Sequence, residues 1–333
     1  MRPGQVLVVE RHAAGIRLAD LLAKSFGHVH HLERRQWLRG GLVRVNGEPC
    51  LDDCRLRTND VVEVRADLGA ARPSPNAGRA GGELPVLFES AHLLVVAKPA
   101  GLTTVPDRTG EQRGVHGLLP QLRPDADLRI VHRLDRDTSG CLVLAKGLAA
   151  AQHCDVAFRD GHVQKTYVAV VHGVPNAASF VVDAWLGPDP RRPGKVVASA
   201  HEQSGFRYAR TRVARRAAYA RHALLALSPE TGRSHQLRVH LQSIGHPIVG
   251  DRDYGGEDLF LSDLKPSYKL RRGVDEKPLT KRLFLHAERI VLRDLDGASV
   301  DVTMPLPDDL AVVLKQLERC VDRRGARATQ DDS

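Results

Sequence analysis

Residues 68–83 divide the chain into two parts, because this stretch (LGAARPSPNAGRAGGE) is rich in alanine, glycine and proline and has no apolar period. Such a composition is typical of a flexible linker, so the 333 residues are expected to form two domains. We predict a small domain over residues 1–67 and a larger one over residues 84–318. The residues after Arg323 lack large apolar side chains, and residues 319–333 are predicted to be a disordered tail.

The smaller part has the pattern of two helices followed by a hairpin. Leucines at positions 18, 21 and 22 and Phe26 recur at the spacing of one helix face. A second, basic helix is expected to end at the glycine pair 40–41, a common capping position, and it carries Arg34, Arg35, Trp37, Leu38 and Arg39. Residues 42–47 (LVRVNG) alternate and close in Asn-Gly, which predicts a tight hairpin, and residues 61–64 supply a further strand.

The larger part alternates strand-like and short helical patterns without the regular rhythm of a doubly wound sheet. Strands are predicted over residues 93–97, 166–171 and 222–227, and helices over residues 148–160 and after Arg233. The pattern predicts an α+β fold with a mixed, mainly antiparallel sheet and flanking helices.

One segment of the larger part combines a polar turn with a buried strand. The run HRLDRDTSG (132–140) ends in glycine and leads directly into the apolar residues CLVLA (141–145). Asp135 therefore lies on a loop held by a rigid element, a common way to present a catalytic group. An aspartate beside Thr-Ser-Gly can also simply cap a turn. Asp137, two residues further on, is expected to point elsewhere and to be structural.

The charge of the chain favours a polyanionic partner. Lys and Arg total 49 against 40 for Asp and Glu, a net charge of +9, and binding to nucleic acid gains from phosphate neutralisation. No apolar run approaches the roughly 18 residues that span a membrane, and no signal peptide is apparent, so a cytoplasmic protein is expected. The five cysteines are expected to be reduced, and the Cys50-x3-Cys54 spacing does not fit a zinc site, so no metal is predicted.

Five segments of the larger part occur in the order found in the RluA-type pseudouridine synthases, and the larger part resembles that family. They are VVAKPAGL (95–102), HRLDRDTSG (132–140), QKTYVAVVHGVP (164–175), TGRSHQLRVHLQSIGHPIVGDRDYGG (231–256) and RLFLHAERI (282–290). The resemblance implies the family's fold with a central cleft, and an enzyme that isomerises uridine in RNA without a cofactor. The smaller part resembles the S4-type RNA-binding fold, in which a basic helix and the following hairpin contact RNA.

The resemblance also implies roles for single residues. Asp135 is the expected catalytic carboxylate, acting either as nucleophile or as the base that removes a ribose proton. Tyr167 would stack on the flipped uracil, and Arg238 would pair with Asp135 and keep it ionised. Substrate-binding roles fall to Arg133, Leu285 and His132, and His132 is also expected to brace its turn by a hydrogen bond. No second acid is marked by the resemblance, which favours isomerisation over hydrolysis.

The expected partner is RNA, with large-subunit ribosomal RNA favoured and transfer RNA as the alternative. A non-catalytic RNA-binding or ribosome-assembly protein is the competing class. The protein is expected to be a monomer without association to membranes. The predicted RNA contacts are Arg34, Arg35, Arg39 and Arg44 in the smaller part, and Lys269, Arg271 and Arg272 in a long basic segment of the larger part.

Overall fold

The structure is a computed structural model, and the chain divides into two compact units, Met1–Ala77 and Gly78–Ser333. The boundary between them falls inside the linker predicted over residues 68–83. The residues that the structure describes are 5–9, 15–25, 34, 37–38, 41–51, 53–64, 84–105, 114–265, 267–270 and 273–328.

The first unit contains a four-stranded antiparallel sheet and helix α1 (Leu18–Ser25). The strand order is β1-β4-β2-β3, and the strands are β1 (Gln5–Val8), β2 (Val43–Val45), β3 (Glu48–Pro49) and β4 (Val61–Val64). Leu18 and Leu22 on one face of α1 pack with Val43 and Val62 of the sheet in a small core. The predicted helix, hairpin and strand are therefore confirmed, whereas β1 was not expected.

Two backbone signals in this unit act as the sequence predicted. Arg34, Trp37 and Leu38 are helical, and Gly41 follows them at φ 67° and donates its N–H to the Leu38 carbonyl. That left-handed residue ends the helix in the way glycine allows. The hairpin turn has positive φ at both Asn46 (53°) and Gly47 (86°), as a type I′ turn requires.

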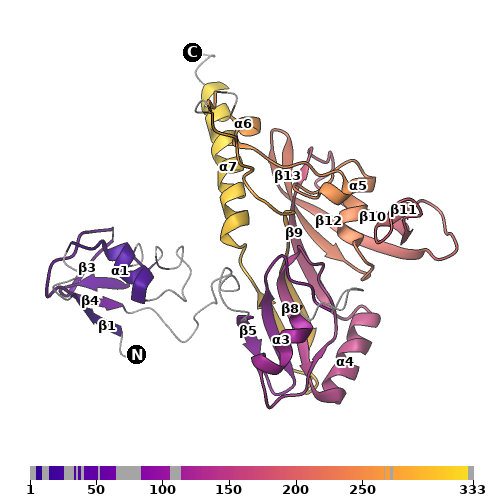
Figure 1. Cartoon of the computed structure of the whole chain (residues 1–333), viewed down its shortest axis with the longest axis horizontal. Coiled ribbons are helices and arrows are strands. Elements are labelled where there is room, and N and C mark those ends of the chain that lie inside the picture. Colours follow the sequence, from indigo (N-terminus) through magenta and orange to yellow (C-terminus); the bar gives the residue numbers. More distant parts are fainter. Residues whose placement is uncertain are drawn as a thin grey trace. The chain divides into compact units, whose positions relative to one another are not determined.

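The second unit is built on one eleven-stranded mixed sheet (Figure 1). Its main path is β11-β10-β12-β13-β9-β14-β8-β6-β5, with β15 paired to β14 and β7 to β8. The strands are β5 (Val86–Glu89), β6 (Leu93–Lys98), β7 (Leu128–Ile130), β8 (Ser139–Lys146), β9 (Gln164–His172), β10 (Ser179–Pro188), β11 (Val196–Ser199), β12 (Arg207–Tyr219), β13 (His222–Pro229), β14 (Leu285–Arg293) and β15 (Ser299–Thr303). The predicted α+β fold with a mainly antiparallel sheet is confirmed.

Helices cover both faces of the sheet around β6 and β8, which explains why these strands are almost wholly apolar. Successive side chains of a strand point to opposite faces. Val95 and Val143 pack with helix α4 (Gly147–Arg159), whereas Leu94 and Leu142 pack with helix α3 (Val115–Leu122). Both strands are buried along nearly their whole length, so they form a rigid base for the loops at their ends.

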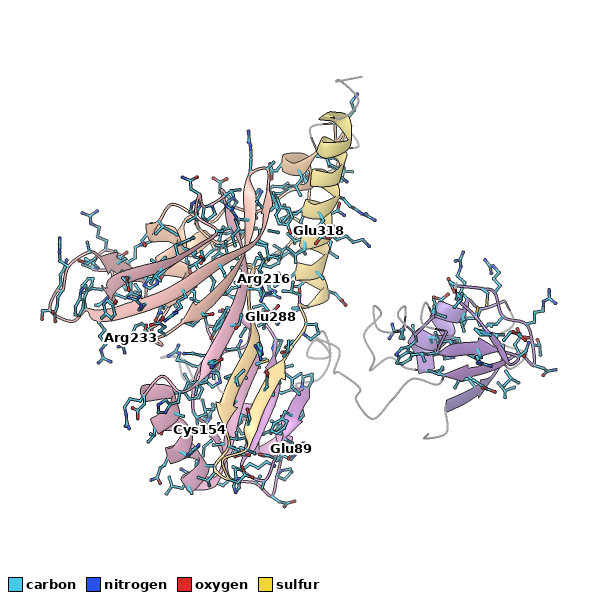
Figure 2. All side chains as sticks on the ribbon, turned by 180° about the vertical axis from the view of Figure 1, so that it is seen from behind. Glu89, Cys154, Arg216, Arg233, Glu288 and Glu318 are labelled. Atoms are coloured by element: carbon cyan, nitrogen blue, oxygen red, sulfur yellow. The ribbon has the colours of Figure 1, made fainter. Side chains whose placement is uncertain are left out.

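The other half of the sheet packs with three further helices, α5 (Gln236–Ser243), α6 (Leu261–Leu264) and α7 (Asp308–Ala328). Leu237 and Leu241 of α5, and Leu310, Val313 and Leu317 of α7, belong to the same core as β9 and β13. On the sheet itself, the Arg216 guanidinium of β12 binds the Glu288 carboxylate of β14 through contacts of 2.8 and 2.6 Å (Figure 2).

Helix α7 continues through Ala328, so the prediction of disorder from residue 319 does not describe residues 319–328. Leu317 is fully buried and Cys320 packs against the same core, so tertiary contacts hold the helix beyond the predicted boundary. The alanine and arginine residues that follow are good helix formers and prolong a helix once it is nucleated.

A single parallel pairing joins the two halves of the sheet. Within the described strands, β14 runs parallel to β8, with His286 beside Ser139 and Ala287 beside Gly140. Gly140 has φ 134°, and a Cβ atom there would lie 2.2 Å from the Ala287 carbonyl oxygen. Only glycine permits this close approach, which brings the start of β14 next to the loop that precedes β8.

Candidate active site

The loop before β8 is fixed by alternate residues. The His132 Nε2 atom accepts a hydrogen bond from the Val143 N–H at 2.9 Å, and burial lowers the pKa of His132 to about 3. The backbone N–H and carbonyl of Leu134 both bind the Thr104 hydroxyl, at 3.1 and 2.8 Å. These contacts hold the main chain on both sides of Arg133, and the side chains of Arg133 and Asp135 line the cleft. The expectation that His132 braces its turn is confirmed.

Lys98 holds the far end of this loop, a role that the sequence analysis missed. Its side chain is fully buried, and its Nζ atom donates to the carbonyls of Pro99, Leu102 and Arg136 at 2.9, 2.6 and 3.1 Å. Burial lowers the pKa of the Lys98 ammonium to about 7, while the charge of Asp135 acts in the opposite direction. A lysine inside an otherwise apolar strand was the available sequence signal.

A cleft of about 490 Å³ opens beside this loop. It is large enough for a nucleotide, within the usual range of small-ligand sites. Residues from four of the five matched segments line it, all except 95–102; they include the predicted Arg133, Asp135, Tyr167, Arg238 and Leu285, and also His132. The structure therefore brings together residues that are more than 100 positions apart in the sequence.

Tyr167 and Leu285 form apolar walls of the cleft. Tyr167 is half-buried in β9, and Leu285 is 2% exposed at the start of β14. The two strands are paired, with Leu285 opposite Ala169 and Tyr167 opposite Ala287. Burial, with a further contribution from the charge of Asp135, raises the pKa of Tyr167, so its phenol stays neutral at physiological pH.

Arg238 is the buried cation of the site. Its Nε and Nη2 atoms bind the two carboxylate oxygens of Asp251 at 2.7 and 2.6 Å, and Nη2 also contacts Asp253 at 3.2 Å. Its Nη1 atom lies 3.8 Å from the Asp135 carboxylate. Burial alone would lower the pKa of Arg238, but the Asp251 carboxylate, with Asp135 added, raises it overall. Arg238 thus pairs with Asp135 as expected, while Asp251 is its primary partner.

A polar frame that the sequence analysis did not identify surrounds Arg238. The Tyr254 ring lies 4.7 Å from the Arg238 guanidinium carbon, and its hydroxyl is 2.6 Å from the Nδ1 atom of His235. Gln236 is buried and binds both the Thr231 hydroxyl and the Thr211 hydroxyl, at 2.7 and 3.0 Å. These contacts fix the loop that leads into α5. All of these residues except Thr211 belong to the matched segment 231–256, so their position in it was the available signal.

The cleft offers one carboxylate that can act on a ligand. Glu230 also lines it, but the Glu230 side chain binds Arg210 at 3.3 Å and Arg212 in a closer contact. Asp135 has a side chain that is 20% exposed, and Arg238 is beside it. A single carboxyl group next to a fixed guanidinium is suited to nucleophilic attack or proton abstraction, and the cleft lacks the acid–base pair that glycoside hydrolysis uses.

Several predicted site residues lie elsewhere or outside the described residues. Asp137 is exposed and does not line the cleft, so it points away from the site, as expected. Arg44 donates to the Gly47 carbonyl of its own hairpin at 3.0 Å, and Arg34 is half-buried with partners of its own. Lys269 is exposed but does not line the cleft, and α6 of the same segment packs on α7 instead. Four predicted RNA contacts lie outside the described residues: Arg35, Arg39, Arg271 and Arg272.

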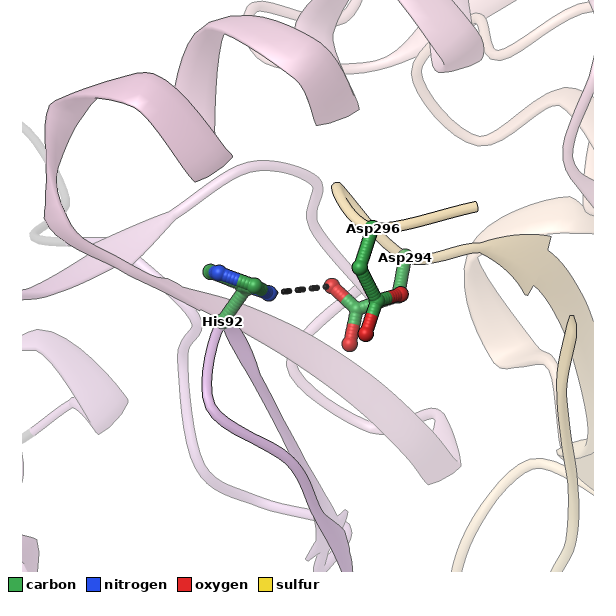
Figure 3. Close-up of side chains that lie close together, drawn as sticks. All are labelled: His92, Asp294 and Asp296. Carbon is green, nitrogen blue, oxygen red and sulfur yellow. Dashed lines mark ion pairs between the residues drawn. The ribbon is translucent and has the colours of Figure 1, made fainter. Parts of the chain in front are cut away.

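One group of side chains among the described residues has the composition of a metal site, but its oxygen atoms accept hydrogen bonds within turns. His92, Asp294 and Asp296 lie together where two strand turns meet, and His92 pairs with Asp294 at 3.4 Å (Figure 3). Asp294 already accepts from the Ser90 hydroxyl at 2.6 Å and from the Leu295 N–H at 2.7 Å. None of these residues lines the cleft.

The two cysteines of the first unit form a hydrogen bond between free thiols. The Cys50 and Cys54 sulfur atoms are 3.3 Å apart, and burial together with this hydrogen bond raises the pKa of Cys54 to about 11.

In the part of the chain that the structure describes, no helix is both long and apolar enough to cross a membrane.

Comparisons with known proteins agree with this arrangement. A family model described as RNA pseudouridylate synthase matches residues 92–243, which include Asp135, Tyr167 and Arg238. The chain is 32% identical to Ribosomal large subunit pseudouridine synthase C of Vibrio cholerae over 324 residues, 95% of this chain and 97% of the relative. The protein of the same name from Pasteurella multocida is 35% identical over 321 residues, 94% of each chain. The solved structure of Human RNA Pseudouridylate Synthase Domain Containing 4 covers 70% of this chain and 92% of that chain, with a TM-score of 0.56 and 27% identity.

Proposed function

Because this chain belongs to the RluA-type family of RNA pseudouridine synthases, we propose that it isomerises specific uridines of large-subunit ribosomal RNA, with Asp135 as its catalytic residue. The observation that carries the assignment is the Asp135 carboxylate in the cleft with Arg238 at 3.8 Å. Arg238 is itself fixed by Asp251, so its guanidinium can attract the Asp135 carboxylate and hold it in place.

The reaction exchanges one bond of the base for another. The N1–C1′ bond of uridine breaks, a C5–C1′ bond forms, and the proton lost from C5 is balanced by one gained at N1, with no net oxidation. Asp135 can assist as a nucleophile at C1′ or as a base toward the ribose C2′ proton, and the geometry supports either route. In either route the protein's own carboxylate provides the chemistry, and Arg238 positions it.

The walls of the cleft support base flipping. A uracil turned out of its stack would lie between the Tyr167 ring and Leu285, and base–aromatic stacking contributes roughly 1–3 kcal/mol. Arg133 is exposed at the edge of the cleft, without a partner among the described residues, and it can occupy the gap that the base leaves or contact a phosphate. Leu285 and Arg133 would thus bind the substrate, as would the loop that His132 fixes.

The choice of ribosomal over transfer RNA rests on the relatives, which are named for the large subunit and align over both units of this chain. The first unit would bind RNA in the manner of an S4 domain. Contacts through Arg34, Arg35, Arg39 and Arg44, and through the segment that contains Lys269, remain predictions. A ribosomal substrate would place the enzyme in the cytoplasm, and we expect it to act as a monomer.

Pseudouridine mapping of total RNA tests the proposal. Cells that lack the protein are rescued with the wild type, with Asp135→Asn, or with Asp137→Asn. The last variant is the control: Asp137 lies two residues after Asp135, is exposed, and does not line the cleft. We expect particular sites in large-subunit RNA to disappear and to return with the wild type and Asp137→Asn only. Sites found in transfer RNA would assign the alternative substrate. If no site changes, the protein is a non-catalytic RNA-binding protein.

A further inference from the structure

Lys165 contributes a cation to the cleft. It lies in β9, two residues before Tyr167, and it is partly buried. Among the residues that the structure describes, no carboxylate pairs with its ammonium group. The ammonium lies over the Phe158 ring, whose centroid is 5.9 Å from the Lys165 Nζ atom.

An unpaired, partly buried ammonium is costly for the free protein, because burial disfavours the charged form and no carboxylate compensates for it. Burial lowers the pKa of Lys165 accordingly. The two acids that line the cleft are both engaged elsewhere, Asp135 by Arg238 and Glu230 by Arg210 and Arg212. Within the described part of the chain, Lys165 therefore has no acidic counter-ion.

The surroundings of Lys165 fit a bound anion. The end of α4 contributes Arg159 to the same cleft; its Nε atom binds Asp160 at 3.0 Å, but its side chain is 71% exposed and its remaining donors can reach a ligand. Arg133 and Arg233 line it as well. Because alternate residues of a strand point to the same side, Lys165 and Tyr167 are about 6–7 Å apart along one face. That separation is comparable to the distance from a nucleobase to the phosphate of its own or the next nucleotide.

We propose that Lys165 binds a backbone phosphate of the RNA next to the flipped uridine, so that the substrate supplies its missing counter-ion. Arg159 widens this phosphate site at the edge of the cleft. The inference rests on the proposed function for the identity of the RNA, while binding of a phosphate chain can be measured without any isomerisation.

The test is the salt dependence of binding of a 12-residue oligouridylate to the full-length protein. Each phosphate that a cation neutralises on a single strand contributes roughly 0.7 to the slope of log K against log salt concentration. Three variants are compared with the wild type: Lys165→Met, Lys165→Arg, and Lys315→Met. The last removes one lysine charge from an exposed position of α7 that does not line the cleft.

We expect Lys165→Met to lower the magnitude of the slope by roughly 0.7, and Lys165→Arg and Lys315→Met to leave it near the wild-type value. We also expect Lys165→Met to melt no lower than the wild type, because it replaces an unpaired cation by an apolar chain of similar length. A purely structural role on the Phe158 ring predicts the opposite: a lower melting temperature with an unchanged slope.

Two results would overturn the proposal. One is an unchanged slope in Lys165→Met, and the other is an equal loss in Lys315→Met, which would show that net charge alone is responsible. These results are distinct from failure of the proposed function, in which the mapping experiment would find no site lost in cells that lack the protein, whatever the slope.

Discussion

Replacing Asp251 by asparagine removes the charge that fixes Arg238 while preserving the shape of the side chain. Asp251 is 2% exposed, Arg238 is 8% exposed, and two hydrogen bonds of 2.7 and 2.6 Å join them. The asparagine oxygen can accept one of these bonds, but its amide group would then face the guanidinium as a second donor. Arg238 would retain Asp253 at 3.2 Å and Asp135 at 3.8 Å.

The expected loss of stability follows from the burial of the pair. Removing one partner of a buried ion pair costs about 3–5 kcal/mol. The two remaining carboxylates offset part of this cost, so we expect the free energy of unfolding of the second unit to fall by about 3 kcal/mol. For a unit of this size that corresponds to a melting temperature lower by roughly 6 °C. Because a displaced catalytic group can cost about 100-fold in rate, we expect kcat/KM to fall by a similar factor.

Urea unfolding followed by circular dichroism measures the stability, and single-turnover conversion of a target RNA measures the activity. The matched control is Asp258→Asn, which breaks a similar pair with Arg252, a residue that is 75% exposed. Pairs exposed to solvent contribute about 0–1 kcal/mol, so the control should change little. If Asp251→Asn lost no more stability than Asp258→Asn, Arg238 would not depend on Asp251 and the reasoning would be refuted.

Three further predictions concern the frame of the cleft. His286 is fully buried, and burial lowers its pKa from 6.5 to about 4. Its contribution to stability is therefore complete above pH 6.5 and is lost as the pH falls toward 4. Unfolding measured across this range should show a loss on the order of 3 kcal/mol in the wild type that His286→Gln lacks, and an equal loss in both proteins would contradict this. Gly140→Ala should cost at least about 3 kcal/mol in chemical denaturation, because its Cβ would lie 2.2 Å from the Ala287 carbonyl oxygen, whereas Gly147→Ala, with open space and φ 82°, should cost about 1–2 kcal/mol. Tyr167→Phe should keep the ring that stacks on uracil and retain RNA affinity, whereas Tyr167→Leu should weaken binding by about 1–3 kcal/mol in a titration, and equal affinities would argue against stacking.

Local patterns predicted the parts of the fold that depend on neighbours in sequence. The Asn46-Gly47 turn and the apolar run 141–145 each determine backbone geometry within a few residues, and both the turn and the strand are found as expected. The loop that carries Asp135 was recognised because a polar turn meets a buried strand at one point. Both features depend on residues that are close together in the chain, so they can be predicted from the sequence alone.

The partners of the site residues could not be predicted in the same way. Asp251 meets Arg238 only because a turn folds back on α5, and nothing in the local pattern distinguishes Asp251 from Asp253 as the buried partner. The role of Lys98 depends in part on the Arg136 carbonyl, which belongs to a loop 38 residues further along the chain. The extension of α7 likewise depends on the core that Leu317 reaches, whereas the residues beyond it have no apolar pattern of their own.

The parallel pairing of β14 with β8 has a consequence for the order in which the enzyme matures. The hydrogen bond between Ser139 and His286 closes a loop of 147 residues, and contacts over such separations form late in folding. A chain emerging from the ribosome would have its acid loop and its Arg238 long before Leu285 is synthesised. We therefore expect a nascent chain to have no wall for the uracil, and to stay inactive, until residues beyond β14 have left the exit tunnel.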